Sequence, residues 1–273
     1  MFSTFLLNYL GEQKNFFLFA RKLNNTMNMI DTAPTESNLS GLDRKNFQKN
    51  INSKKTDLYI LKNALGMEVA VTNYGCAILS IMVPDKNGKY ANVILGHDSI
   101  EHVVNSPEPF LSTTVGRYGN RIANGKFTLY GEEHQLTVNN GPNSLHGGPT
   151  GFHARVWDAV QPNESTVIFN YTSADGEEGF PGTLEVEMTY RLEDETNALV
   201  IEYRATTDKA TVVNLTNHGF FNLAGIANPT PTVLNHTITI NADHYIPIDE
   251  VSIPTGEILK VEGTPMDFRT PHT

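Results

Sequence analysis

A histidine at the end of a polar row is the residue in this sequence best suited to move a proton. Residues 214–223 (NLTNHGFFNL) follow the β-branched run 211–213, which favours an extended backbone. Side chains alternate along a strand, so we expect Asn214, Thr216 and His218 on one face. A lone histidine in a strand is usually structural. An imidazole that completes a row of hydrogen-bonding groups beside aromatic residues is also a candidate general acid.

A second histidine, His146, lies in the loop 139–148 (NNGPNSLHGG), which contains three asparagines, three glycines and a proline. Such loops are held by hydrogen bonds from their side chains to their own backbone, which would fix the position of His146. An ordinary long turn with an incidental histidine is the alternative. That alternative weakens because His218 also lies among Asn and Gly residues, with no acidic or Cys partner nearby.

Two arginines lie four residues apart in the glycine-containing stretch 116–122 (GRYGNRI). A turn of this kind can direct guanidinium groups at hydroxyls or carboxylates. For Arg117 we expect an exposed loop position. Arg121 is flanked by Asn120 and the apolar Ile122, and is expected to point inward.

Two further stretches carry carboxylates. Residues 263–269 place Asp267 between apolar neighbours, which predicts a partly buried carboxylate with a hydrogen-bonding task. Residues 175–182 form a Gly/Pro loop with paired glutamates, which predicts a solvated acidic turn. The other interpretation of that loop is a wall of the site, contributed by Phe180.

The sequence gives little support to a metal site or to a nucleic-acid partner. Neither His146 nor His218 lies in an HxH, HxxxH or HxxE pattern, so we expect no metal, and the other seven histidines are expected to be structural or exposed. Cys76 is the only cysteine, which excludes an intrachain disulfide and a Cys-based metal site. A net charge of −10 gives a nucleic-acid partner no electrostatic support.

The N-terminal part differs from the rest in composition. Residues 1–56 carry eight Lys or Arg and four Asp or Glu, and they show little periodicity. Their apolar patches are too short to span a membrane and match a secretory signal poorly. We predict a disordered leader or linker over 1–56 and one folded domain over 57–273. The single cysteine and the lack of a convincing signal favour the cytoplasm. A periplasmic or secreted location is the alternative if the leader is a targeting segment.

The elements that would position these residues are mostly strands. Alternating or β-branched runs separated by turn residues predict strands at 58–61, 68–72, 78–83, 166–172, 183–192, 198–206 and 236–241. A hairpin is predicted over 126–136 with its turn at 131–132, and one short helix near 99–104. No strand–helix alternation indicates a parallel sheet. The sequence therefore predicts an all-β fold, a large antiparallel β-sandwich.

Three of these stretches together resemble the aldose 1-epimerase (galactose mutarotase) family. They are 116–122, 139–148 and 214–223, they occur in the family's order, and the resemblance extends from about Ser40 to the last residue. It implies a galactose mutarotase-like supersandwich. It also implies interconversion of the α and β anomers of free aldoses such as galactose and glucose. The expected partner is thus a small sugar, with no cofactor.

The same resemblance implies roles for individual residues. His218 would protonate the ring oxygen of the sugar, and His146 would hydrogen-bond the sugar. Arg121 and Asp267 would hold its hydroxyls, with Asn120 beside them. The reaction needs a base for the C1 hydroxyl and an acid for the ring oxygen; the ring opens to an aldehyde and closes on the other face.

The sequence departs from the family pattern at its end. The family's catalytic base is a glutamate downstream of the segment that matches 265–269, and this chain stops at Thr273. We therefore expect a C-terminally truncated chain with an incomplete sandwich. Glu177, Glu178 and Glu257 lie in no matching motif and are not expected to replace that base.

Two alternatives to an active epimerase follow. One is a non-catalytic carbohydrate-binding sandwich that keeps Arg121, His146 and Asp267 as ligands. The other is a sugar-phosphate epimerase, for which the twelve Lys and Arg of residues 57–273 leave few to spare.

Overall fold

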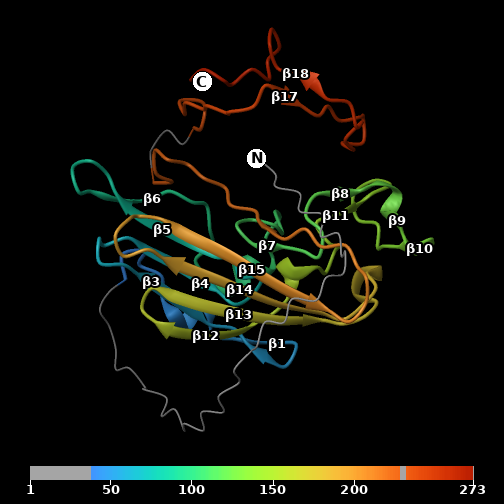
Figure 1. The fold of residues 1–273 in the computed structure, drawn as a ribbon. Coiled ribbons are helices and arrows are strands. Elements are labelled where there is room, and N and C mark those ends of the chain that lie inside the picture. Colours follow the sequence, from blue (N-terminus) through green and yellow to red (C-terminus); the bar gives the residue numbers. More distant parts are fainter. Residues whose placement is uncertain (1–37, 228–231, 273) are drawn as a thin grey trace, which may run out of the picture.

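Two four-stranded antiparallel sheets form the body of the protein in a computed structural model that describes residues 38–227 and 232–272 (Figure 1). The first sheet contains, in spatial order, β3 (Leu58–Lys62), β4 (Glu68–Thr72), β5 (Ile78–Pro84) and β6 (Tyr90–Asn92). The second contains β12 (Asp158–Asn163), β13 (Thr166–Ser173), β14 (Leu184–Leu192) and β15 (Leu199–Thr207). The expected all-β antiparallel sandwich is confirmed.

The main core lies between the two sheets. Alternate residues of β14, from Leu184 to Leu192, are buried, while the intervening residues face away from the core. They pack against apolar residues of β4 and β5 and against Trp157, whose Nε1 donates to the carbonyl of Phe152 at 3.2 Å. This is the pattern expected of a sheet that buries one face.

A second, smaller core covers the other face of the first sheet. Here Ala70 and Leu79 pack against Ile100 and Val103 of α1 (Ile100–Val104). Ser99 caps this short helix by accepting the backbone N–H of His102 at 3.3 Å. All five residues of β4 are consequently buried.

Phe47 shows that the fold begins before residue 57. It ends η1 (Arg44–Phe47), it is 0% exposed, and it packs in the second core. The strand pair β1 (Asn50–Ile51) and β2 (Lys54–Lys55) follows. The expectation of a disordered leader is therefore wrong for residues 38–56, because one buried aromatic residue can anchor a segment that shows no periodicity. The rest of that prediction, residues 1–37, lies outside the described residues.

Short strand pairs and turns carry the loops singled out in the sequence. They are β7 (Thr114–Val115) with β16 (Thr216–Asn217), β8 (Arg121–Ile122) with β11 (Ser144–Leu145), the hairpin β9 (Lys126–Leu129) and β10 (Glu132–Gln135), and the single turns η2 (Ala123–Gly125), η3 (Phe152–Ala154) and η4 (Glu177–Gly179). The hairpin turn is Tyr130-Gly131, one residue earlier than expected, with φ of 50° and 86°.

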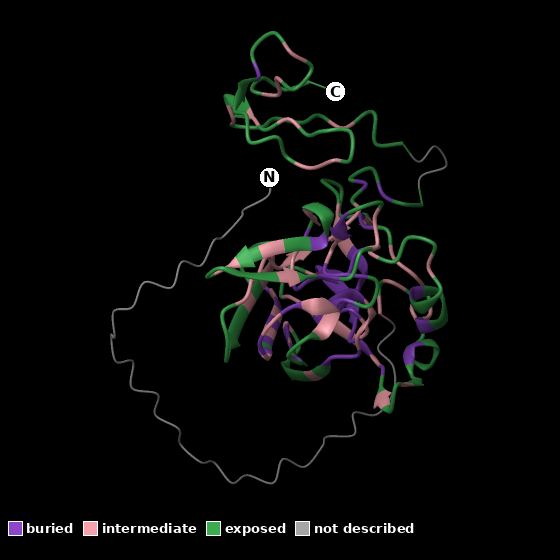
Figure 2. Ribbon diagram, turned by 90° about the vertical axis from the view of Figure 1, so that its right-hand side faces the viewer, coloured by how far each residue is buried: buried purple, intermediate pink, exposed green. Residues whose placement is uncertain are grey.

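Residues 232–272, here called the C-terminal segment, lie apart from the sandwich in both views (Figures 1 and 2). Their regular structure is β17 (His244–Tyr245) paired with β18 (Leu259–Lys260). The expected strand at 236–241 is wrong: this stretch makes one isolated bridge, from Ile238 to His272. Two hydrogen bonds join the segment to the body: the Asn143 side chain donates to the carbonyl of Val251 at 3.1 Å, and the N–H of Leu223 donates to His236 Nε2 at 2.8 Å. No helix among the described residues is long and apolar enough to cross a membrane.

Candidate active site

His218 is placed by a strand pair in the interior of the body. Thr216 and Asn217 pair with Val115 and Thr114, and immediately beyond this pair the N–H of His218 donates to Thr113 at 2.9 Å. The carbonyl of His218 in turn accepts from Ser112 at 3.0 Å. The N–H and the carbonyl of His218 are therefore both hydrogen-bonded, which fixes the position of its Cα and Cβ atoms.

The alternation expected along this strand is observed. Val213 and Leu215 pack against the main core, and the Asn217 amide donates to the hydroxyl of Tyr190 at 3.0 Å. Asn214 belongs to the other set: its side chain donates to the carbonyl of Gly119 at 3.0 Å, which ties the strand to the 116–122 loop.

His146 is held by its own loop, as the sequence predicted. Asn139 bonds Leu145 in both directions, through its amide at 3.0 Å and its side-chain oxygen at 2.7 Å. His146 and Asn120 then bond reciprocally: the His146 N–H donates to the Asn120 carbonyl at 3.0 Å, and the Asn120 N–H donates to His146 Nδ1 at 2.9 Å. Since Nδ1 accepts a hydrogen bond, a neutral His146 carries its hydrogen on Nε2.

Gly147 lets the His146 loop reach the 116–122 loop. A Cβ at Gly147 would lie 1.9 Å from the carbonyl oxygen of Gly116, a distance that no side chain tolerates. Its φ of +82° also favours glycine. The two loops therefore touch main chain to main chain, and this contact brings Asn120, Arg121 and His146 together.

The two histidines meet inside an aromatic cluster. The ring centroids of His146 and His218 are 5.1 Å apart with their planes at 89°. The centroid of the Phe110 ring lies 4.6 Å from that of His146 and 4.5 Å from that of His153. Phe110 also stacks on His218, with the centroids 6.2 Å apart. Phe220 stacks on His218 at 5.0 Å. Sequence reasoning singled out neither Phe110 nor His153, because only packing between distant segments places them here.

Burial keeps two of these histidines uncharged at neutral pH. Desolvation, then the neighbouring His218, Arg121 and His153, lowers the pKa of His146 from 6.5 to about 4. Desolvation also lowers the pKa of His153, which is 4% exposed, to about 4. His146 can thus donate a hydrogen bond from Nε2. The ring nitrogens of His218 make no hydrogen bond within the described chain.

Arg121 lies beside His146 and is half-buried, as expected. It pairs with Leu145 across β8 and β11, and its Nε donates to the side chain of Asn140 at 2.8 Å. Nη1 donates weakly to Asn120 at 3.4 Å, and Nη2 has no hydrogen bond among the described residues. Its guanidinium therefore keeps donors for a hydroxyl-bearing ligand.

Arg117 is not the exposed loop residue that the sequence predicted. It is 2% exposed, and its guanidinium donates to Ser173, to the carbonyls of Ala174 and Pro181, and to Thr211. These acceptors lie more than fifty residues away in the sequence, so no local pattern revealed them. Arg117 is a structural residue.

The loop 175–182 is also better ordered than predicted. Glu177 accepts from the hydroxyl of Tyr171 at 2.6 Å and from Ser173 at 2.9 Å, so this end of the loop is not a solvated acidic turn. Phe180 is buried beneath Arg117, whose guanidinium carbon lies 5.7 Å from the ring centroid. Phe180 therefore supports Arg117 and forms no wall of the histidine site.

Asp267 lies in the C-terminal segment, apart from the histidine cluster. Its side chain is partly buried, as expected, but both carboxylate oxygens accept from Arg269, at 2.9 and 2.7 Å. This pair lowers the pKa of Asp267 to about 2. The structure thus brings together Asn120, Arg121, His146 and His218, and it leaves Asp267 occupied by another partner.

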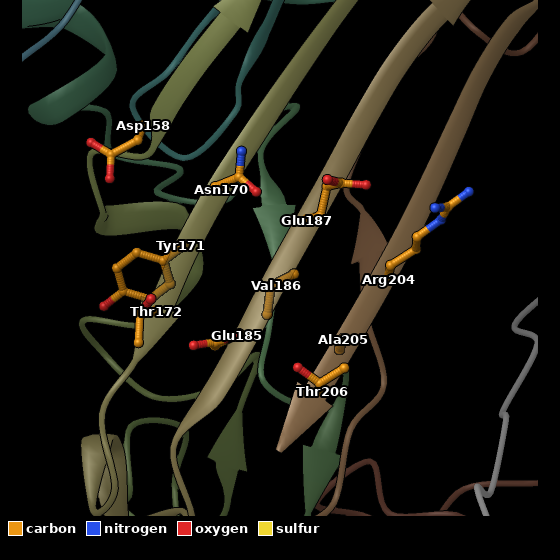
Figure 3. Close-up of a pocket in the computed structure, with 10 residues that line it drawn as sticks. All are labelled: Asp158, Asn170, Tyr171, Thr172, Glu185, Val186, Glu187, Arg204, Ala205 and Thr206. Atoms are coloured by element: carbon orange, nitrogen blue, oxygen red, sulfur yellow. The ribbon is translucent and has the colours of Figure 1, made fainter. Parts of the chain in front are cut away.

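A separate shallow depression of about 450 Å³ lies on the outer face of the second sheet (Figure 3). A cross-strand row of polar residues crosses it, in register: Asp158, Asn170, Glu187 and Arg204. It contains none of the residues predicted for the site. Among residues 38–227 and 232–272, no three His, Cys, Asp or Glu residues form a group that could hold a metal ion.

The antiparallel sandwich and the paired histidines define a protein of the galactose mutarotase-like class. A family model described as aldose 1-epimerase matches residues 57–273, so the chain belongs to the aldose 1-epimerase family.

Known relatives agree with this assignment. The chain is 45% identical over 205 residues to a galactose mutarotase from Bos taurus, covering 75% of this chain and 58% of that protein. It is 43% identical over 213 residues to an aldose 1-epimerase from Escherichia coli (strain K12), covering 78% and 60%. The crystal structure of an aldose epimerase homologue from C. elegans superposes with a TM-score of 0.74 at 33% identity, covering 80% and 65%. The chain therefore spans about three fifths of the length of these curated relatives.

Proposed function

We propose that this protein is an aldose 1-epimerase, which interconverts the α and β anomers of a free hexose such as galactose or glucose. The observation that carries the proposal is the histidine pair: two imidazoles 5.1 Å apart, one of them held as a neutral donor. The family membership and the names of the relatives support the same reaction.

The two histidines take different parts in this reaction. His146 is fixed by Asn120 and donates from Nε2 to an oxygen of the sugar, which orients the ring. His218, whose ring nitrogens are free of hydrogen bonds within the described chain, delivers the proton to the ring oxygen. Arg121 and Asn120 supply donors to the hydroxyls beside it.

The base that removes the proton of the C1 hydroxyl is the other half of the reaction. No carboxylate among the described residues forms a hydrogen bond or an ion pair with His146 or His218. Of the glutamates considered from the sequence, Glu177 is held by Tyr171 and Ser173, and Glu178 accepts from the N–H of Thr150 at 2.9 Å. Glu257 lies in the C-terminal segment. We therefore expect slow turnover from the acid half of the site alone.

Polarimetry tests the proposal. Freshly dissolved α-galactose should reach its anomeric equilibrium faster with the protein than without it. His218→Asn should remove the protein-dependent rate, by roughly 10²-fold or more, with little change in galactose affinity. His134→Asn is a matched control, since that histidine packs against Phe127 on the β9–β10 hairpin. Galactose binding without any added rate in the unaltered chain would instead identify a carbohydrate-binding module.

A further inference from the structure

His218 and His146 differ in what holds their rings. The His146 ring is fixed by a hydrogen bond from the Asn120 N–H to Nδ1 at 2.9 Å. The backbone of His218 is fixed by Thr113 and Ser112, but neither of its ring nitrogens has a hydrogen-bond partner in the described chain. Packing alone must therefore set the orientation of the His218 imidazole.

Two phenyl rings supply that packing. Phe220 lies 5.0 Å from the His218 ring with the planes 29° apart, and Phe110 lies 6.2 Å away with the planes 30° apart. Both rings are thus nearly parallel to the imidazole. The described ring contacts include none between Phe110 and Phe220, as expected if the two occupy opposite faces of His218.

Phe110 is itself anchored to the backbone that carries His218. The N–H and the hydroxyl of Thr113 both donate to the Phe110 carbonyl, at 3.2 and 3.1 Å, and the Thr113 carbonyl accepts the N–H of His218. The Phe110 ring also packs at steep angles against two more imidazoles, with centroid distances of 4.6 Å for His146 and 4.5 Å for His153. One side chain therefore contacts all three histidines of the cluster.

We propose that Phe110 is a positioning residue for the epimerisation: together with Phe220 it holds the His218 imidazole against His146 and leaves both His218 ring nitrogens to the sugar. This inference rests on the proposed function. Holding the ring by its faces orients it without consuming a nitrogen, which a hydrogen bond could not do. Loss of such orientation costs rate at the chemical step more than it costs binding.

Phe110 also contributes to the burial of His146. Burial is the largest cause of the low pKa of that imidazole, and the Phe110 ring packs against it with the ring centroids 4.6 Å apart. The charged or titratable groups that remain around His146 are His218, Arg121 and His153. Opening this cover should raise the pKa of His146 from about 4 toward 6.5.

The test compares Phe110→Leu with Phe127→Leu. Phe127 lies 5.0 Å from His134 with the planes 31° apart, so its replacement removes the same kind of contact outside the site. Phe110→Leu should lower kcat roughly 10- to 100-fold with KM within about threefold, and Phe110→Tyr should restore most of kcat. Phe127→Leu should leave both constants unchanged. Equal losses in the two leucine variants would overturn the proposal.

A second readout does not depend on turnover. Imidazole signals of the full chain, assigned with His146→Asn and His218→Asn, are followed by NMR across the pH range. Phe110→Leu should shift the His218 signals and raise the pKa of His146, while Phe127→Leu should move only His134. If the unaltered chain shows no mutarotation, the proposed function fails and this measurement still decides the positioning role. Unchanged His146 and His218 signals in a folded Phe110→Leu protein would refute that role. Phe220→Leu, expected to act in the same direction on His218, serves if Phe110→Leu does not fold.

Discussion

The body of the protein, residues 38–227, buries many of its apolar side chains, whereas the C-terminal segment leaves most of its large ones exposed. The body closes two cores around its first sheet, whereas Val261, 3% exposed, is the one hydrophobic residue of the C-terminal segment among the buried residues described. Half of the exposed large hydrophobic side chains in the described chain lie in that segment (Figure 2). A similar supply of Val, Ile and Leu thus gives a packed sandwich in one region and an open arrangement in the other.

The comparison shows that residues with high β propensity form a strand only where neighbouring strands and a facing sheet pack against them. Residues 236–241 alternate as well as those of β14 do, yet β14 pairs along all nine residues with β15 and the 236–241 stretch makes one bridge. Strand preference largely measures packing on a pleated surface, so without a facing sheet the same pattern stays irregular. Asn120, Arg121, His146 and His218 all come from the body, where such support exists.

The largest difference between the two regions should appear when an arginine is removed from each. Arg117→Met leaves several buried carbonyls without a donor, and should destabilise the body by about 3–5 kcal/mol. Arg269→Met removes only the exposed ion pairs with Asp267 and Asp243 and should change stability little. Urea unfolding followed by Trp157 fluorescence measures both. A similar loss in the two variants would contradict the contrast.

Acid should act on the buried His153 of the body at a higher pH than on Asp267 of the C-terminal segment. The pKa of His153 is 6.5 when unfolded and about 4 when folded, so between these values the unfolded state binds more protons. The stability that His153 contributes should therefore be fully present above pH 6.5, fall by about 3 kcal/mol on the way to pH 4, and change little below pH 4. The pKa of Asp267 is lowered from 3.8 to about 2, so the stability that this carboxylate contributes should be lost as the pH falls between these two values.

Urea unfolding at pH 7, 5 and 3.5 checks this range, with His153→Asn as the diagnostic variant. Its unfolding free energy should depend less on pH between 7 and 4, because of the described histidines only His146 and His97 then keep a lowered pKa. An unchanged slope in the variant would show that His153 is not the group responsible.

A smaller effect is expected from single hydroxyl groups. Tyr190→Phe removes the donor to the Cys76 carbonyl at 2.8 Å and the acceptor of Asn217 behind the His218 strand. It should cost about 1–2 kcal/mol. Tyr245→Phe in the C-terminal segment should cost less than about 0.5 kcal/mol, because no hydrogen bond of that hydroxyl occurs among the described residues. Chemical denaturation of the two variants measures these losses. A larger loss in Tyr245→Phe than in Tyr190→Phe would contradict the contrast between the two regions.

The smallest effect should come from polar replacements in the C-terminal segment. Ile258 is 70% exposed, so Ile258→Ser should alter the unfolding free energy by less than about 0.5 kcal/mol. Thermal denaturation measures the change, with the exposed Val160→Ser on β12 as the matched control in the body. A loss above about 1 kcal/mol at Ile258 alone would mean that this surface is covered in solution.

Local patterns predicted those parts of the fold whose causes are local. Three strands of the second sheet, β13 to β15, follow from alternation between turns, whereas β12 was not predicted. The rigidity of the His146 loop follows from Asn139 bonding within its own loop. The inward turn of Arg117 could not be predicted, since its acceptors come from residues 173–181 and 211. Phe110 and His153 were missed for the same reason: their contacts join segments that only the folded chain brings together.

The contact at Gly147 has a consequence for anyone who redesigns this site. Where two backbones touch, no rotamer change can absorb a substitution, so the spacing between the 116–122 loop and the His146 loop is a fixed dimension of the molecule. Variation in ligand preference would have to come from side chains around this frame, because the frame itself does not adapt.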